Sequence, residues 1–294
     1  MSKIIIGETE YPLESLGNDK YRVVVGLYVY IGGLKDGKRH GKGTFSGEDY
    51  SYDGYWENDT MTGYGVMKCD KFEYHGDFLH DLFHGYGQIT FQNGITYIGN
   101  WLNSRFNGYG EYCHYSGFQY IGEFKDDFFQ GNGKLIYKNG DVYEGFFEKD
   151  MACGHGTFKY ENGDKYHGDF LDDKFHGKGK FHYANGEIYN GDFENDFFQG
   201  HGTFTKKNGD RYQGNFNIGT FSGAGVYYYD DKRKYVGEWK NNIKHGKGTF
   251  YWTNGEIYKG HWENGKRHGK GLKKKNNEWI PTEFCFGKKK KIVQ

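Results

Sequence analysis

The chain has 294 residues, of which 49 are glycine, 20% are aromatic and only two are proline. This composition suits many short strands joined by tight turns, and it argues against collagen and against a disordered chain. The formal net charge is zero, but residues 241–294 carry +9 and residues 1–240 therefore −9, an asymmetry that favours head-to-tail attraction or an acidic partner and does not select nucleic acid.

Residues 1–27 precede the repeated part of the chain. Ile4–Ile6 and Tyr21–Val25 are β-prone and flank a turn-like segment at Ser15–Asp19. The uncovered edge of a sheet invites aggregation or a partner strand. We therefore predict an N-terminal β-rich cap over residues 1–27, with an edge open to a partner as the alternative.

Residues 28–275 repeat one pattern eleven times, and the period is 23 residues in most copies. Each copy has a Tyr-x-Gly run followed by a Gly-x-Gly run, and several end on an Asn-Gly turn signal. Both runs alternate with period two, as in strands that bury one face. The sequence predicts an all-β fold, an elongated single-layer antiparallel meander of about 22 strands made of eleven β-hairpins. With strands ~4.8 Å apart, it would be a twisted ribbon roughly 100 Å long.

The glycines are expected to face one another beneath aromatic rings. In the eighth copy, closing the hairpin with Gly191 opposite Gly202 would also place Phe193 opposite Gly200. Glycine weakens a strand unless another group packs on it. The ring of Tyr189 and its aromatic neighbours are the expected filler.

The two runs at this period resemble the MORN repeat (membrane occupation and recognition nexus). The copies cover more than four fifths of the chain, and eleven in phase are far more specific than one. The resemblance implies a non-enzymatic scaffold that holds other proteins or dimerises, similar to MORN proteins of ciliary radial spokes and protist cytoskeletal assemblies. It also implies an alternative, a peripheral membrane adaptor similar to MORN proteins proposed to bind phosphoinositides.

The opposite face of the strands is predicted to be polar. Acidic residues alternate out of phase with the aromatic ones, as in a sheet with one solvated side; examples are Asp77, Glu123, Asp169, Asp192 and Glu238. The aromatic face must be shielded by twist, by curling or by a partner. We expect its rows to be core, with a usable groove along part of them as the alternative.

Six phenylalanines recur two residues before the second glycine pair, in segments that the pattern indicates are loops. The MORN family usually has a basic or small residue there, so Arg39, Lys244 and Arg267 resemble the family and the phenylalanines depart from it. Repeats two strands apart would space the rings ~10 Å apart along one edge, which suits a long helix or a second MORN ribbon. The rings are either a partner-binding stripe or packed onto the adjacent hairpin. The six are Phe83, Phe106, Phe129, Phe175, Phe198 and Phe221.

No pattern predicts catalysis, a cofactor or a metal site. There is no P-loop or nucleophile elbow, and Gly-x-Gly lies between strands rather than at the start of a helix. Equivalent histidines in neighbouring repeats would lie ~10 Å apart, too far to share a zinc ion with bonds of ~2 Å. We expect stacking or hydrogen bonding of the histidines that precede glycine pairs, which are His40, His84, His176, His245 and His268.

Residues 276–294 are expected to form a basic C-terminal cap or tail. A lysine run beside aromatic residues can rest on anionic lipid, at ~1 kcal/mol per lysine near the surface. The alternative is a solvated strand cap with a charged end. The candidates for contact with lipid or an acidic partner are Lys288, Lys289, Lys290 and Lys291.

The cysteines and the apolar stretches bear on location. Cys69, Cys113, Cys153 and Cys285 form no Cys-x-x-Cys pair, and no secretory leader is recognisable, which favours reduced thiols in an intracellular protein. The longest apolar stretch, Val23–Ile31, is too short to span a bilayer. We expect a protein of the cytoplasm or cytoskeleton with protein partners, a possible homodimer and no nucleic acid; the resemblance implies a cilium or flagellum.

Overall fold

The computed structural model describes residues 2–6 and 9–290, and within these ranges it contains 27 β-strands and no α-helix. No helix that could span a membrane is found in the described part of the chain. The chain divides into two compact units, residues 1–140 with 146–150 and residues 141–145 with 151–294.

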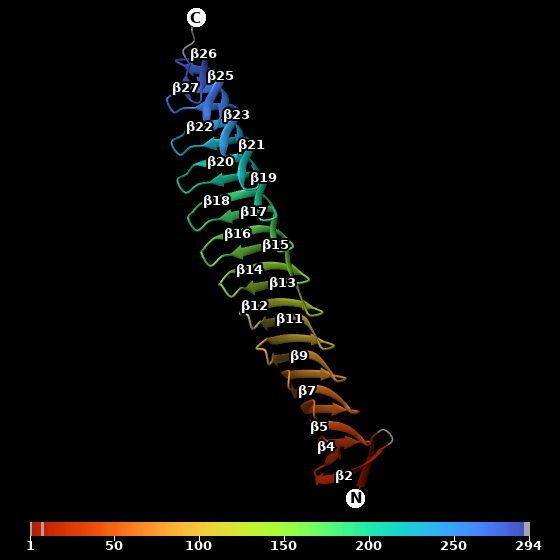
Figure 1. The fold of residues 1–294 in the computed structure, drawn as a ribbon. Coiled ribbons are helices and arrows are strands. Elements are labelled where there is room, and N and C mark those ends of the chain that lie inside the picture. Colours follow the sequence, from red (N-terminus) through yellow and green to blue (C-terminus); the bar gives the residue numbers. More distant parts are fainter. Residues whose placement is uncertain (1, 7–8, 291–294) are drawn as a thin grey trace. The chain divides into compact units, whose positions relative to one another are not determined.

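Unit 1 is an antiparallel meander in which each strand pairs with the next strand in the chain, as the red to yellow strands of Figure 1 show. Its strands are β1 (Ser2–Ile6), β2 (Thr9–Gly17), β3 (Lys20–Val25), β4 (Tyr28–Lys35), β5 (Lys38–Ser46), β6 (Tyr50–Glu57), β7 (Thr60–Cys69), β8 (Phe72–Leu79), β9 (Leu82–Phe91), β10 (Thr96–Leu102), β11 (Arg105–Cys113), β12 (Gln119–Lys125) and β13 (Phe128–Ile136).

Unit 2 has the same meander topology from β15 onward. The strand β14 (Val142–Glu148) contributes residues to both units. The strands of unit 2 are β15 (Met151–Lys159), β16 (Lys165–Leu171), β17 (Lys174–His182), β18 (Ile188–Glu194), β19 (Phe197–Thr205), β20 (Arg211–Asn217), β21 (Thr220–Tyr228), β22 (Lys234–Lys240), β23 (Ile243–Tyr251), β24 (Ile257–Glu263), β25 (Lys266–Lys275), β26 (Glu278–Cys285) and β27 (Lys288–Lys289).

The eleven predicted hairpins correspond to the strands from β4 to β25, which confirms the all-β meander of 22 repeat strands. The remaining strands lie before and after the repeats. The two β-prone segments of the N-terminal region fall in β1 and β3, and the turn between β2 and β3 is at Asn18–Asp19. The cap function assigned to these strands, and to residues 276–294, stays a prediction.

The first tyrosine of each repeat is the centre of the core. Tyr189 on β18 is fully buried, and Gly191 lies opposite Gly202 beneath its ring, as predicted. A Cβ atom at Gly202 would stand 2.6 Å from the ring, so only glycine fits there. The hydroxyl of Tyr189 donates a hydrogen bond to the carbonyl oxygen of Asp192 at 2.8 Å. The same bond, to the residue three positions on, is made by Tyr30, Tyr52, Tyr74, Tyr97, Tyr120, Tyr166, Tyr212, Tyr235 and Tyr258.

The end of the hairpin differs from the prediction. Phe193 lies opposite Phe198, not opposite Gly200, which pairs instead with Phe216 of the next repeat. The physical reason is a two-residue turn at Asn195–Asp196, where both residues have positive φ, as in a type I′ turn. The strands therefore continue to the turn, and the two surplus residues, Gly200 and His201, are taken up in a β-bulge. Gly200 has φ of +60° there, a conformation that favours glycine.

The acidic residues of the polar face stabilise this bulge. Asp192 accepts a hydrogen bond through Oδ2 from the backbone N–H of His201, the residue between the two glycines, at 2.9 Å. Because a bulge leaves backbone groups without a strand partner, the carboxylate replaces a missing acceptor. The same bond is made by Asp77, Glu123, Asp169 and Glu238.

The hairpin turns tie each repeat to the one before it. Asp196, the second turn residue, accepts a hydrogen bond from the backbone N–H of Phe175 at 2.8 Å and donates its own N–H to the carbonyl of Phe175 at 3.1 Å. Consecutive hairpins are thus joined outside the strand ladder. Equivalent side-chain bonds are made by Asp59, Asp81, Ser104, Asp127, Asp150, Asp173 and Asn242.

Removing the tyrosine hydroxyl should destabilise the sheet less than filling the space beneath the ring. We expect Tyr189→Phe to lower the free energy of unfolding by about 1 kcal/mol through the lost hydrogen bond. Gly202→Ala should cost about 1–3 kcal/mol, because the new methyl group collides with the ring. Urea unfolding followed by tryptophan fluorescence measures both. Tyr109→Phe, at an exposed tyrosine, is the control, and an equal loss there would contradict the role given to the buried hydroxyl.

Removing the turn carboxylate should weaken the link between repeats. Asp196→Gly deletes the acceptor without adding backbone strain, and we expect a loss of about 1 kcal/mol. Asp196→Asn keeps the acceptor and should remain close to the parent protein. The matched control is Asn195→Gly, because in the described part of the chain this side chain makes no hydrogen bond. Equal stability of Asp196→Gly and Asn195→Gly in thermal unfolding would rule out the link.

Candidate interaction surface

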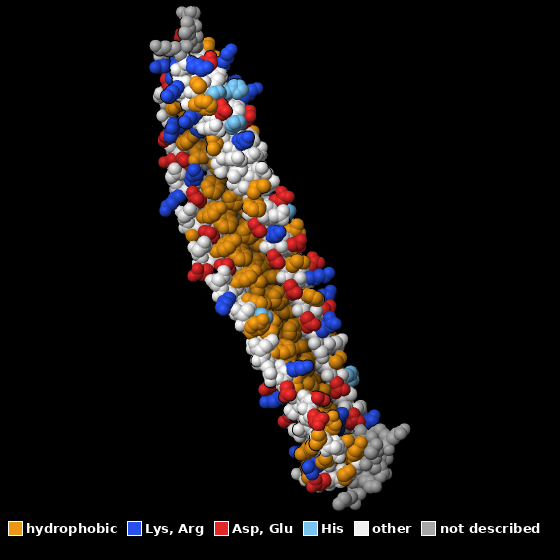
Figure 2. All heavy atoms as spheres, in the orientation of Figure 1, with side chains coloured by type: hydrophobic (Ala, Val, Ile, Leu, Met, Phe, Trp, Pro, Cys, Tyr) orange, Lys and Arg blue, Asp and Glu red, His pale blue; other side chains and the backbone are white. Residues whose placement is uncertain are grey.

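The aromatic face of unit 2 carries two adjoining hollows, and Figure 2 shows hydrophobic side chains gathered along the face in view. A cavity of about 550 Å³ is lined by Phe198, Phe221, Tyr229 and Lys244, among others. A second, of about 390 Å³, shares Phe198 and is lined also by Phe175. We call these two hollows the aromatic groove. The rings of the core therefore also form a surface that a ligand can reach.

The six phenylalanines lie on strands and not in loops, which corrects their predicted placement. Phe198 lies on β19, and its ring stacks on Tyr189 with centroids 3.7 Å apart and planes 10° from parallel. Phe175 is buried and the other five are half-buried. Their inner faces therefore belong to the core, and their role in binding a partner stays a prediction. The other stacked pairs, at 3.8–3.9 Å, are Tyr74–Phe83, Tyr97–Phe106, Tyr120–Phe129, Tyr166–Phe175 and Tyr212–Phe221.

Cations occupy the same position in three repeats. In unit 1 the guanidinium of Arg39 lies 3.8 Å from the ring centroid of Trp56 and pairs with Asp59 at 3.2 Å. In unit 2 the guanidinium of Arg267 lies 4.2 Å from the ring centroid of Phe284. A cation over an aromatic face is attracted by the ring quadrupole, so it can replace the stacked phenylalanine.

Lys244 is the third of these cations, and it lines the aromatic groove. Its Nζ donates a hydrogen bond to the hydroxyl of Tyr229 at 2.9 Å and lies 4.9–5.5 Å from four ring centroids, including that of Trp262. Burial, followed by the charge of Arg233, lowers the pKa of Lys244 to about 8. The groove therefore contains an amine that titrates near physiological pH.

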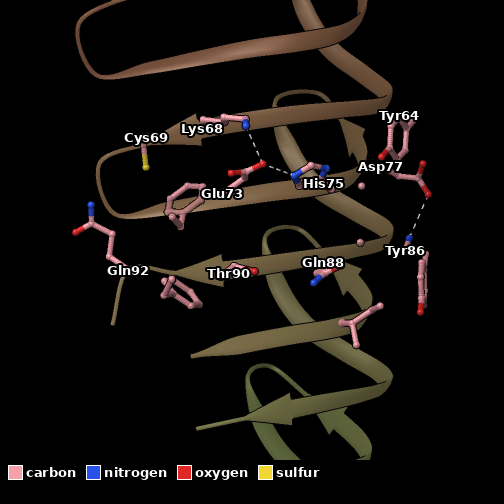
Figure 3. A pocket seen from close by; sticks show the side chains of 15 residues that line it. Tyr64, Lys68, Cys69, Glu73, His75, Asp77, Tyr86, Gln88, Thr90 and Gln92 are labelled. Atoms are coloured by element: carbon pink, nitrogen blue, oxygen red, sulfur yellow. Dashed lines mark hydrogen bonds and ion pairs between the residues drawn. The ribbon is translucent and has the colours of Figure 1, made fainter. Parts of the chain in front are cut away.

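The polar face of unit 1 carries a shallow cavity of about 930 Å³, which the sequence analysis missed (Figure 3). In its centre Glu73 pairs with Lys68 at 2.9 Å and with His75 at 2.5 Å, and the hydrogen bonds from Lys68 and then His75 lower the pKa of the Glu73 carboxyl. Tyr64 and Tyr86 are exposed beside it. The sequence signal for this cavity is a tyrosine between the two glycines of Gly-x-Gly, which recurs in consecutive copies.

The histidines that precede glycine pairs and the four cysteines do not gather into one site in the described part of the chain. Nδ1 of His268 accepts a hydrogen bond from the backbone N–H of Phe286 at 3.4 Å, and the His268 ring lies 4.6 Å from the Phe286 ring at a tilt of 51°. Nδ1 of His40 and of His84 is buried and has no hydrogen-bond partner among the described residues. Within residues 2–6 and 9–290, no group of three or more His, Cys, Asp or Glu is placed to hold a metal ion. None of the four cysteines forms a disulfide within the described residues.

The C-terminal lysines are only partly available. Lys288 and Lys289 are exposed on β27, whereas Lys290 pairs with Glu283 at 2.8 Å. Lys291 lies outside the described residues. A contact with lipid or an acidic partner at this end stays a prediction.

Comparison with known families decides the identity of the repeats. The MORN repeat model matches eleven consecutive segments, at residues 30–51, 52–71, 74–96, 97–117, 120–142, 143–165, 166–188, 189–211, 212–232, 235–257 and 258–277. The chain belongs to the MORN repeat family. MORN repeats suggest a repeat-based scaffold that interacts with proteins or associates with membranes. No curated protein matches the chain significantly.

Solved structures show only a limited likeness. The TCP domain of Drosophila melanogaster SAS-4 (dCPAP), in complex with a proline-rich motif of Ana2, is 12% identical, with 51% of this chain and 83% of that one covered and a TM-score of 0.35. The G-box domain of the microcephaly protein CPAP is 7% identical, with 68% and 100% covered and a TM-score of 0.37. These scores are too low to establish a shared fold.

The buried amine should make stability depend on pH. Because the pKa of Lys244 is lower in the folded protein than in the unfolded chain, folding releases a proton between about pH 8 and pH 10, and this group's contribution to stability rises with pH there. We expect Lys244→Met to be more stable than the parent protein at pH 7, and the advantage to shrink by pH 9.5. Urea unfolding at several pH values measures it. Lys240→Met, at an exposed lysine, should show no such trend, and a pH-independent difference for Lys244→Met would contradict the shift.

Proposed function

We propose that this MORN protein is a non-enzymatic scaffold whose aromatic groove holds another protein of a cytoskeletal assembly. The observation that carries the proposal is the row formed by Phe175, Phe198 and Phe221 in unit 2. Each ring is fixed by stacking on a buried tyrosine, and its other side faces the cavities. Rigid aromatic side chains in hollows are the usual anchors of protein interfaces.

The repeat spacing favours a helical partner. Equivalent residues of consecutive repeats are two strands apart, roughly 10 Å. An α-helix rises about 10.5 Å over seven residues, so apolar side chains at i, i+7 and i+14 would meet successive rings. A long amphipathic helix laid along unit 2 therefore matches the row. A second MORN ribbon, in a homodimer, is the other partner that this periodicity suits.

The cellular setting is the less specific part of the proposal. The family resemblance supports a cytoskeletal location, and the most specific location that it supports is a ciliary radial spoke. Cytoskeletal or axonemal subunits are then the proposed partners, in the cytoplasm of a cilium or flagellum. Four cysteines without a disulfide among the described residues agree with a reducing compartment.

A peripheral membrane adaptor is the second candidate. It is favoured by the net charge of +9 over residues 241–294 and by the exposed Lys288 and Lys289. Anionic lipid attracts such clusters at ~1 kcal/mol per basic residue. The pairing of Lys290 with Glu283 removes one of the lysines from this count.

Loss of the groove rings should abolish partner capture. We expect the double variant Phe198→Leu and Phe221→Leu to lose the proteins that the tagged parent chain captures from a cell that makes it, because leucine keeps apolar volume but removes both stacked rings. The capture uses salt high enough to screen weak surface contacts. The matched control replaces two exposed rings, Phe128→Leu and Tyr109→Leu, and circular dichroism confirms folding of both proteins.

The two candidate functions give opposite results in a parallel experiment on vesicles with anionic lipid. A defined set of captured cytoskeletal proteins, lost only in the groove variant, supports the scaffold. Capture of no protein, together with vesicle sedimentation that Lys288→Gln and Lys289→Gln abolish, would replace the scaffold by the membrane adaptor. Equal capture by the groove variant and its control would overturn the role of the groove.

A further inference from the structure

Two histidines meet on the polar face of unit 2, apart from the aromatic groove. His155 on β15 and His167 on β16 have their Nε2 atoms 3.1 Å apart, and their rings are close to perpendicular at 86°. Both are exposed. They come from positions that the strand register makes diagonal neighbours, since His155 lies opposite Asp169 and His167 opposite Thr157.

The outer ring nitrogen of each histidine is fixed by a different partner. Nδ1 of His155 lies 3.1 Å from Oδ1 of Asp169, and Nδ1 of His167 lies 2.9 Å from the hydroxyl of Thr157. Asp169 is itself held by the backbone N–H of Lys178, at 3.0 Å from Oδ2. An ionised carboxylate only accepts hydrogen bonds, so Asp169 is an acceptor for His155. A carboxylate, a backbone carbonyl or water on the far nitrogen is the support that metal-binding histidines commonly have, and the Thr157 hydroxyl takes this place for His167.

The protons on the imidazole rings of His155 and His167 can be arranged in two ways. Asp169 only accepts, so the neutral His155 carries its proton on Nδ1 and presents a lone pair at Nε2. Without a metal ion, His167 donates from Nε2 to that lone pair and accepts from the Thr157 hydroxyl. With the proton moved to Nδ1, His167 donates to Thr157, because a hydroxyl can both donate and accept. Both Nε2 lone pairs are then free, and no hydrogen bond to Asp169 or Thr157 is lost.

The separation of the two nitrogens suits a shared ion. With bonds of ~2.0–2.1 Å from a zinc ion to histidine nitrogen, a nitrogen separation of 3.1 Å gives an angle of roughly 95–100° at the metal. This lies between the square-planar and tetrahedral values. Two further positions would be filled by water or by a donor from another molecule, since no third His, Cys, Asp or Glu joins the pair in the described part of the chain.

We infer that His155 and His167 form a binding site for a divalent transition-metal ion of the zinc class, with Asp169 and Thr157 as positioning residues. Copper(II) and nickel(II) also accept imidazole ligands, and magnesium and calcium do not prefer them. The charge of Lys180 works against the site, because this exposed residue lies opposite His167 in the register of β16 and β17. The charge of Lys178 is engaged in an ion pair with Asp192.

Titration of the full chain with Zn²⁺ by calorimetry at pH 7.5 tests the site. We expect one ion per chain at this site, and at least a tenfold loss of affinity in His155→Gln and in His167→Gln. Thr157→Val should weaken binding about tenfold, as loss of a supporting hydrogen bond does in other metal sites. Lys180→Gln should tighten binding, which is a change of opposite sign that loss of folding would not produce.

The chain offers a matched control in a later repeat. His201 occupies the position of His155, but Asn215 replaces Asp169 and Gln213 replaces His167. His201→Gln should therefore leave zinc binding unchanged. Nitrogen NMR of the imidazoles should show both Nε2 atoms of the pair shifted by Zn²⁺, with circular dichroism as the check on folding. Three results would overturn the site: a zinc affinity of His155→Gln equal to that of the parent chain, a loss of affinity in His201→Gln equal to that in His155→Gln, or no Zn²⁺ binding by the parent chain. The two histidines would then form only a hydrogen bond.

Discussion

The packing of a tyrosine ring on two bare glycines is the interaction on which the rest of this structure depends. A sheet with a single apolar layer has no second layer against which to bury its side chains. Tyr189 resolves this by lying flat along its own hairpin, where Gly191 and Gly202 let the ring reach the backbone. Its hydroxyl then reaches the bulge, and the stacked Phe198 covers its other side. The backbone thus takes the place of an opposing layer.

This arrangement makes each repeat depend on its neighbours. The ring of Tyr189 meets Phe216 of the following repeat edge to face, with centroids 4.9 Å apart. The turn carboxylate of Asp196 reaches back to Phe175 of the preceding repeat. Stability in such a chain is approximately a sum of repeat terms and nearest-neighbour terms. An aromatic partner along the groove would touch the same rings that join the repeats, so binding and stability are linked in this fold.

The sequence was sufficient for the parts of the fold that its period determines. Alternation and the glycine pairs predicted the strands, their face and the pairing of Gly191 with Gly202. The bulge is not predicted, because the segment between the Tyr-x-Gly run and the Gly-x-Gly run of a repeat resembles a loop. The signal for a tight turn is Asn195–Asp196, since asparagine and aspartate tolerate positive φ. That one error moved Phe198 from strand to loop. The hydrogen bond that Asp192 makes to the bulge was also not predicted. An acidic residue on the solvated face of a strand is expected whether or not it has a structural role.

The candidate sites were less predictable, because they depend on register at the level of single residues. His155 and His167 meet because the uninterrupted register of β15 and β16 makes them diagonal neighbours. In the aromatic groove, the identity of one side chain per repeat decides the character of the surface. Along unit 2 this position holds Ala152, then phenylalanine at 175, 198 and 221, and then Lys244 and Arg267. A phenylalanine ring and a cation can each pack on the tyrosine or tryptophan ring beneath them, so the core tolerates either one. The exchange gives the row a direction: a ligand that follows the groove meets apolar rings first and charged groups afterwards.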